Sequence, residues 1–156
     1  ALVGFGIIEK LGNQFKVIDY GVIETFKGEK MCDRLEKVYN GVKALIEKYK
    51  PEEMALEELF FQNNQKTAIN VAMARGVTLL AGVEKLGSDK LYEYTPMQIK
   101  QALTGVGRAE KKQVQYMTKC ILNLKEIPKP DDAADALAVA LTHAQTNQMI
   151  GNFKIQ

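Results

Sequence analysis

The sequence predicts an α/β domain with a mixed β-sheet. Two runs with strand character come first, and a tight-turn signal, Gly12-Asn13, separates them. Helical and strand-like runs then alternate along the rest of the 156-residue chain, whose length suits one domain. Because the hairpin pairs its strands antiparallel and the alternating part favours parallel pairing, we expect a sheet that contains both.

The hairpin strands are expected at residues 2–10 and 15–25, where β-branched and aromatic residues recur. An amphipathic helix should follow over residues 32–50, and Pro51 should end it. The apolar residues that recur at helical spacing in this segment are Leu35, Val38, Val42, Leu45 and Ile46.

Shorter signals predict the remaining elements. MALEELFF, residues 54–61, predicts a short buried strand, and LYEY, residues 91–94, predicts another. Thr95 can cap the next helix, with Pro96 at its first position. Helices are expected at residues 67–87, 97–103, 111–122 and 131–146. The domain would then span residues 1–146, followed by a frayed C-terminal tail over residues 147–156.

Composition excludes several classes of protein. Apolar residues make up 46% of the chain, which is enough for a core, and no apolar run reaches the roughly 18 residues of a membrane span. The net charge is only +2, so a nucleic-acid surface would need local clustering. Cys32 and Cys120 lie in different predicted helices, outside any CxxC pattern. They are therefore expected to be reduced packing residues in a cytoplasmic protein.

The last predicted helix carries acids where burial is expected. Asp132 and Asp135 are three residues apart, which places them on one face in the first two turns. Asp131 is a good N-cap, and acids in a first turn suit the helix dipole. These explanations fit Asp135 poorly, because alanine, leucine and valine fill most faces of this helix. An unpaired charge beside a core is costly, and a divalent cation would remove that cost.

Glu57 poses the same question at the C-terminal end of a predicted central strand. Ligands of open α/β sheets bind at that end. The alternative is an ordinary strand-exit acid, which is our interpretation of Glu58 on the opposite face. Spacing alone leaves both possibilities open for Glu57. If it joins Asp132 and Asp135 in a metal site, the oxygen-only ligands favour Mg²⁺ or Mn²⁺ over Zn²⁺.

His143 is the only histidine, so this chain by itself cannot form a multi-histidine metal site. It lies eight residues beyond Asp135. That separation corresponds to about 12 Å along a helix, at 1.5 Å rise per residue. We therefore expect His143 to be structural rather than a ligand of the same metal.

Several motifs together resemble the RuvC-type Holliday junction resolvases, a family with a ribonuclease H-like fold. GFGIIEK resembles the family's second strand, ALEELFF its acidic strand and ARGV part of its long central helix. YTPMQIKQALTGVGRAEKKQVQYM resembles its basic segment, and DDAADALAVALTH its C-terminal helix. The last two motifs are long and specific, and the resemblance covers nearly the whole chain.

The resemblance implies an active site of four carboxylates that hold two Mg²⁺ ions, for which Mn²⁺ can substitute. Three of them carry over to Glu57, Asp132 and Asp135, as catalytic and metal-binding residues. The family's first carboxylate lies in a GIDPGT-like motif, on a strand that precedes the position of Leu2, and no such motif occurs here. We therefore expect that the sequence lacks its beginning. The mixed five-stranded sheet flanked by helices would be complete only with that first strand.

Four basic residues are expected to face DNA. Gly105 and Gly107 form a loop before a helix N-terminus, whose free N–H groups suit phosphate. The basic residues clustered around this loop are Lys100, Arg108, Lys111 and Lys112. Ordinary solvated charge is the alternative explanation, but the resemblance implies that Lys100 and Lys111 contact DNA near the scissile strand.

Two aromatic residues, Phe60 and Phe61, follow the acidic part of the strand. Most adjacent aromatics are core residues, and one of these two is expected to be. The resemblance assigns Phe60 a stacking contact with an unpaired base near the crossover, a contact worth about 1–3 kcal/mol. Phe61 would assist it.

The long helix over residues 67–87 is apolar on several sides. The residues expected to pack inward are Ile69, Ala72, Met73, Gly76, Val77, Leu80 and Ala81. Val71, Thr78 and Leu79 are then left for either an interior layer or a partner subunit. The resemblance favours a two-fold homodimer, because a four-way junction needs two matching nicks.

The resemblance thus implies a magnesium-dependent endonuclease that resolves Holliday junctions in DNA recombination and repair, by cutting two opposing strands. The branch-migration proteins RuvA and RuvB are its implied partners. Two alternatives stay open at this point. One is a ribonuclease H-like nuclease that acts on other branched DNA or on RNA, and the other is a protein that binds junctions without cutting them.

Overall fold

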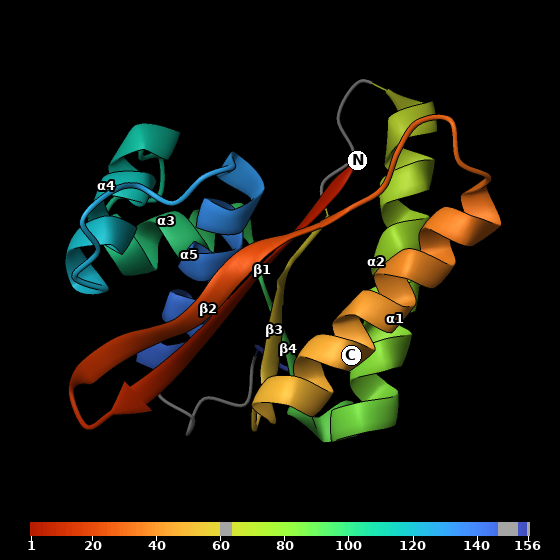
Figure 1. Cartoon of the computed structure of the whole chain (residues 1–156). Coiled ribbons are helices and arrows are strands. Elements are labelled where there is room, and N and C mark those ends of the chain that lie inside the picture. The colour runs from red at the N-terminus through yellow and green to blue at the C-terminus, as the bar shows by residue number, and fades with distance from the viewer. Residues whose placement is uncertain (60–63, 147–152, 156) are drawn as a thin grey trace.

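The computed structural model describes residues 1–59, 64–146 and 153–155. A long hairpin runs through the middle of the molecule, with two helices on one side and three on the other (Figure 1). The first group is α1 (Met31–Tyr49) and α2 (Gln65–Leu86), and the second is α3 (Pro96–Thr104), α4 (Lys111–Ile121) and α5 (Asp131–Gln145). None of the helices in these ranges is long and apolar enough to cross a membrane.

The hairpin consists of β1 (Leu2–Leu11) and β2 (Gln14–Glu24), which pair antiparallel as predicted. The pairing runs from Leu2 opposite Glu24 to Leu11 opposite Gln14, with one irregularity between Ile7 and Ile8. Gly12 occupies the two-residue turn with φ +64°. Glycine suits this turn because a side chain would strain a left-handed backbone.

A second pair of strands carries the acidic end that sequence analysis singled out. β3 (Met54–Glu57) and β4 (Leu91–Tyr94, preceded by the 3-10 turn η1, Ser88–Lys90) pair in parallel. β3 ends at Glu57 rather than at residue 61. The Glu58 N–H still bonds the Tyr94 carbonyl at 2.8 Å, but β4 stops there. Pro96 begins α3 two residues later, so β4 cannot extend the pairing with β3 any further.

The two strand pairs form separate two-stranded sheets in the described part of the chain. A cavity of about 600 Å³ lies between them, with β1 on one side and β3 on the other. Helices α1, α2 and α5 supply the rest of its walls. The four expected strands are therefore present, but they do not join into one sheet.

Helix α5 is the centre of the larger hydrophobic core. Leu137 and Leu141 are fully buried, and they pack with residues of β4, α3 and α4. Two glycines on β1 allow the helix to lie close to the hairpin. A Cβ built on Gly4 would stand 1.9 Å from the Asp132 carbonyl oxygen, and one on Gly6 would stand 2.8 Å from the Leu137 side chain.

The starts of α3 and α5 differ in how they are capped. Thr95 caps α3 and Pro96 is its first residue, as predicted, and Gln98 completes a capping box with Thr95. At α5 the N-cap is Pro130, and Asp131 is already the first helical residue. The expected role of Asp131 as N-cap is therefore wrong, because the helix starts one residue earlier than that role requires.

Helix α2 is rotated relative to the prediction. Thr78, Ala81 and Gly82 are its buried residues, and a Cβ on Gly82 would meet the Met54 side chain of β3 at 2.9 Å. Packing against the strands therefore decides that this face of α2 is the buried one. Residues expected to pack inward that are instead exposed are Ile69, Met73, Gly76 and Leu80. Apolar side chains surround the helix, so periodicity alone gave no unique orientation.

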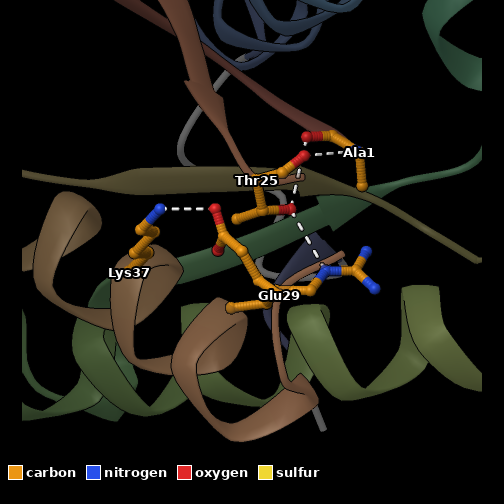
Figure 2. Close-up of polar contacts among 5 residues, drawn as sticks. Ala1, Thr25, Glu29 and Lys37 are labelled. Carbon is orange, nitrogen blue, oxygen red and sulfur yellow. Dashed lines mark hydrogen bonds and ion pairs between the residues drawn. The ribbon is translucent and has the colours of Figure 1, made fainter. Parts of the chain in front are cut away.

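The passage from β2 into α1 is held by short polar contacts (Figure 2). The Ala1 amine donates to the Thr25 carbonyl at 2.7 Å, and the Thr25 N–H donates to the Ala1 carbonyl at 2.9 Å. Lys37 of α1 pairs with Glu29 at 2.6 Å, and this hydrogen bond holds the pKa of the Glu29 carboxyl below its usual value. Arg34 of α1 donates its Nε–H to the Thr25 hydroxyl oxygen at 3.5 Å, which ties the open end of the hairpin to the start of α1.

Two smaller features complete the fold. Cys32 and Cys120 are both free, as expected, but both are exposed, so neither is a core packing residue. Part of the C-terminal segment returns to the sheet, because the Ile155 N–H donates to the Leu91 carbonyl and Phe153 stacks on Tyr94. These contacts cover β4 at the edge away from β3.

The substitution Gly4→Ala should lower the free energy of unfolding by about 1–3 kcal/mol, because its methyl group must push α5 away from β1. Gly28→Ala is the control, since a Cβ at Gly28 would meet nothing within 4 Å. Its effect should stay below about 0.5 kcal/mol. Urea unfolding measures both. Equal stability of the two variants would contradict the close approach of α5 to the hairpin.

Candidate metal centre

Three acids from distant parts of the chain line the same cavity. Glu57 is the last residue of β3, while Asp132 and Asp135 lie in the first two turns of α5. The close contact between α5 and β1 brings the helix start to the end of β3. The three residues that sequence analysis grouped therefore line one cavity, and Glu57 and Asp135 are near enough for their charges to interact.

Glu57 stands in an environment that opposes its negative charge. Partial burial raises the pKa of its carboxyl, and the nearby Asp135 raises it further. Lys111, Lys100 and Arg75 act in the opposite direction. The side chain keeps a solvent-exposed surface at the cavity mouth, so water or a ligand can still reach it. Glu57 and Asp135 are thus close enough to repel each other.

Asp135 has the same character. Burial raises the pKa of its carboxyl, and Asp131 and Asp132 add to the rise. Lys111 partly compensates through its charge and a hydrogen bond. Two carboxylates that each resist ionisation beside negative neighbours are a common feature of functional sites. A bound cation would stabilise their charged forms.

Lys111 currently supplies positive charge to these acids. Its Nζ lies 3.3 Å from Asp131 Oδ2 and 3.4 Å from Asp135 Oδ2. Burial acts to lower the pKa of Lys111, but Asp135 and Asp131 outweigh burial and raise it. Lys111 is the first residue of α4, where a capping box between Glu110 and Gln113 holds the helix start.

Arg75 is a site residue that sequence analysis missed. From α2, its Nη1 donates to the Glu57 backbone carbonyl at 2.6 Å. Its Nη2 pairs with Glu93 Oε2 of β4, also at 2.6 Å. The sequence feature that could have identified Arg75 is an arginine in the mostly apolar middle of a helix, because a charge in such a place needs a partner.

The acids fit a divalent cation by their chemistry, although they do not form a finished cage. In the described ranges no three His, Cys, Asp or Glu side chains are grouped closely enough to hold a metal ion. Glu57, Asp132 and Asp135 nevertheless share one cavity and offer only oxygen ligands, which suit hard cations such as Mg²⁺. Asp132 is exposed, so its carboxylate is free of packing constraints that would prevent reorientation.

The other predicted DNA-facing residues surround this centre or fall outside the description. Lys100 lies on α3 near Glu57. Arg108 and Lys112 are exposed around the start of α4, and Gly105 ends α3 in the left-handed conformation, with φ +77°. Phe60 and Phe61 lie outside the described residues.

His143 belongs to a different cluster, as expected. Its Nδ1 lies 2.6 Å from the Tyr94 hydroxyl, and its Nε2 lies 3.6 Å from Glu53 Oε2. Burial lowers the pKa of His143, against the influence of Glu53. The histidine therefore packs at the far end of α5, away from the three acids.

Comparison of the sequence with known proteins identifies the family of the chain. The family described as crossover junction endodeoxyribonuclease RuvC matches residues 1–143. The chain belongs to the RuvC family. The match includes all three acids and the basic residues of α3 and α4.

Relatives named crossover junction endodeoxyribonuclease RuvC cover almost the whole chain. The protein of Brevibacillus brevis is 51% identical over 150 residues, which are 96% of this chain and 89% of the relative. The protein of Clostridioides difficile is also 51% identical, over 149 residues, which are 96% of this chain and 87% of the relative.

Solved RuvC structures confirm the expected ribonuclease H-like α/β fold. The structure titled T. thermophilus RuvC in complex with Holliday junction substrate is 37% identical and superposes with a TM-score of 0.86. The superposition covers 92% of this chain and 87% of that one. The Thermus thermophilus RuvC structure gives a TM-score of 0.85, and covers 97% of this chain and 91% of its own.

Lys111→Gln should raise the carboxyl pKa of both Asp135 and Glu57, because Lys111 lowers the pKa of each. Titration of ¹³C-labelled carboxyl groups by NMR, without divalent cations, measures the shift. Lys112→Gln is the matched control, since the adjacent lysine is not among the groups that influence either acid. Unchanged titration of Asp135 in Lys111→Gln would show that the ion pair does not persist in solution.

Proposed function

We propose that this protein is an endonuclease that resolves Holliday junctions by paired nicks in two opposing strands. The observation that carries the proposal is the meeting of Glu57, Asp132 and Asp135 at one cavity. Membership of the RuvC family supports it, and so does the likeness to a RuvC structure that contains a Holliday junction substrate. The chemistry is hydrolysis of a phosphodiester in DNA recombination and repair.

In this proposal Glu57, Asp132 and Asp135 hold two Mg²⁺ ions, for which Mn²⁺ can substitute. Bound ions of this kind activate water and stabilise the leaving oxygen of a phosphodiester. The chain itself brings β3 and α5 together. It holds Glu57 and Asp135 where partial burial raises the pKa of each carboxyl group, so a cation would stabilise their charged forms. Lys111 offsets part of that negative charge through its ion pairs with Asp131 and Asp135.

Basic residues around the acids would bind the DNA backbone. Lys100 and Lys111 both act on Glu57, so phosphate held by them would lie beside the carboxylates. Arg108 and Lys112 are exposed nearby and would extend the contact along the strand. Stacking of a base on Phe60, assisted by Phe61, stays a prediction.

A second copy of the chain would cover the exposed side of α2. Four apolar residues there, Ile69, Met73, Leu80 and Val83, are 40–59% exposed and recur at helical spacing. A Cβ on Gly76, in the middle of this α2 stripe, would meet nothing within 4 Å, so a partner helix could approach closely. A two-fold dimer would present two equivalent sites to a four-way junction.

RuvA and RuvB are proposed partners, and the cytoplasm is the proposed location.

Glu57→Gln and Asp135→Asn should each reduce cleavage of a four-way junction below detection in Mg²⁺. Junction binding should survive, because phosphate contacts dominate affinity. Glu58→Gln is the control, since it neutralises the neighbouring acid. Cleavage gels and gel-shift titrations measure the two properties.

Cutting by Glu57→Gln at the wild-type rate would remove this residue from the active site. Wild-type protein that binds four-way junctions without cutting them would instead favour a non-cleaving junction binder. Faster cutting of flaps or RNA–DNA hybrids would favour a different ribonuclease H-like nuclease.

Leu80→Glu should convert a dimer into monomers, because it places a charge in the centre of the α2 stripe. Sedimentation velocity at micromolar concentration measures the change. Tyr116→Glu is the control, because Tyr116 is 58% exposed on α4, outside the stripe. If Leu80→Glu sediments as the wild type does, the second copy does not bind through this surface.

A further inference from the structure

Arg75 is nearly withdrawn from solvent although it belongs to a largely apolar helix. Its side chain is only 16% exposed. The guanidinium satisfies its charge and two of its donors through Glu93 Oε2 and the Glu57 carbonyl oxygen, each at 2.6 Å. A buried charge of this kind is retained at a cost, so its partners deserve a functional explanation.

The two partners sit side by side at the ends of β3 and β4. Leu56 of β3 pairs with Glu93 of β4, and Glu57 pairs with Tyr94. The next N–H, that of Glu58, bonds to β4. Because successive residues of a strand direct their backbone groups to alternate sides, the Glu57 carbonyl points away from β4. On the side away from β4, the Glu57 carbonyl accepts a hydrogen bond from Arg75.

We propose that Arg75 is a positioning residue, which fixes the last peptide of β3 so that the Glu57 carboxylate faces Asp135 across the cavity. The inference rests on the proposed nuclease function and adds a residue to that site. One planar guanidinium fixes two acceptors in a set geometry, which a lysine ammonium cannot do. We call Arg75, the Glu57 carbonyl and Glu93 the Arg75 clamp.

The position of the clamp within α2 gives it a second consequence. Arg75 lies between Met73 and Gly76, which belong to the exposed stripe on the other side of the same helix turn. A partner subunit that steadies this turn would also steady the end of β3. The clamp is thus the direct connection between the proposed subunit contact and Glu57.

Four variants test the clamp in the full protein. Arg75→Ala removes both contacts, Arg75→Lys keeps the charge but at most one contact, and Glu93→Gln keeps an acceptor without its charge. Lys85→Ala is the matched control, because it removes an ion pair with Glu47 farther along the same helix. The measurements are kcat and KM on a four-way junction in Mg²⁺, junction Kd without metal, Mn²⁺ affinity by EPR, and urea unfolding.

Arg75→Ala should lower kcat about 10²-fold, since misplacement of a catalytic group by about 1 Å has that effect. Its junction Kd should stay within about twofold of wild type, because phosphate contacts set affinity. Mn²⁺ affinity should fall together with kcat. Arg75→Lys should fall between Arg75→Ala and wild type, and Lys85→Ala should match wild type in kcat and Mn²⁺ affinity.

Wild-type kcat and Mn²⁺ affinity in Arg75→Ala would overturn the clamp. A rise in junction Kd with unchanged kcat would also overturn it, by making Arg75 a DNA contact. If Arg75→Ala does not fold, Arg75→Lys and Glu93→Gln decide, and wild-type values in both overturn the clamp. If wild-type protein does not cut junctions, the nuclease function fails and Mn²⁺ affinity alone tests the clamp.

Discussion

The site depends on how closely the backbone of α5 lies against β1. Gly4 and Gly6 present no side chains to the helix, and Ala133 and Ala134 are buried at its start. Small residues on both sides let the helix approach until its first turns reach the level of the β3 end. A larger residue at Gly4 would displace Asp132 first, because its carbonyl is the nearest atom. Packing in the core therefore sets the geometry of the acids.

The acids and the cations of the site come from different elements of the fold. The acids belong to β3 and α5, whereas the nearby cations belong to α2, α3 and α4. Arg75, Lys100 and Lys111 offset charge that burial and mutual repulsion would otherwise make costly. Each cation is in a different relation to the acids, since Arg75 bonds the backbone, Lys111 bonds carboxylates and Lys100 acts through its field.

Sequence reasoning succeeded where signals were local. The turn at Gly12, the capping box at Thr95 and the helical spacing of α1 predicted their elements closely. The candidate acids were proposed because each carries charge beside apolar neighbours, and their role stays a prediction. Membership of the RuvC family supports the function inferred from them.

Features that depend on distant partners could not be predicted in the same way. β3 ends at Glu57 because β4 ends at Tyr94, a fact about another segment. The buried face of α2 is chosen by the strands beneath it, and the ion pair of Lys111 joins residues 24 apart in sequence. Arg75 was missed because one of its partners is a backbone carbonyl, which has no signature in the sequence, and the other, Glu93, belongs to a different strand.

We propose that three carboxylates from two elements, β3 and α5, bind divalent cations together. The most direct measurement is ¹³C NMR of the carboxyl groups during a titration with paramagnetic Mn²⁺. The account predicts that the signals of Glu57, Asp132 and Asp135 broaden together at the lowest Mn²⁺ concentrations, well before those of Glu29 and Asp89. Broadening of Glu57 only at concentrations that also broaden Glu29 and Asp89 would contradict a shared metal centre.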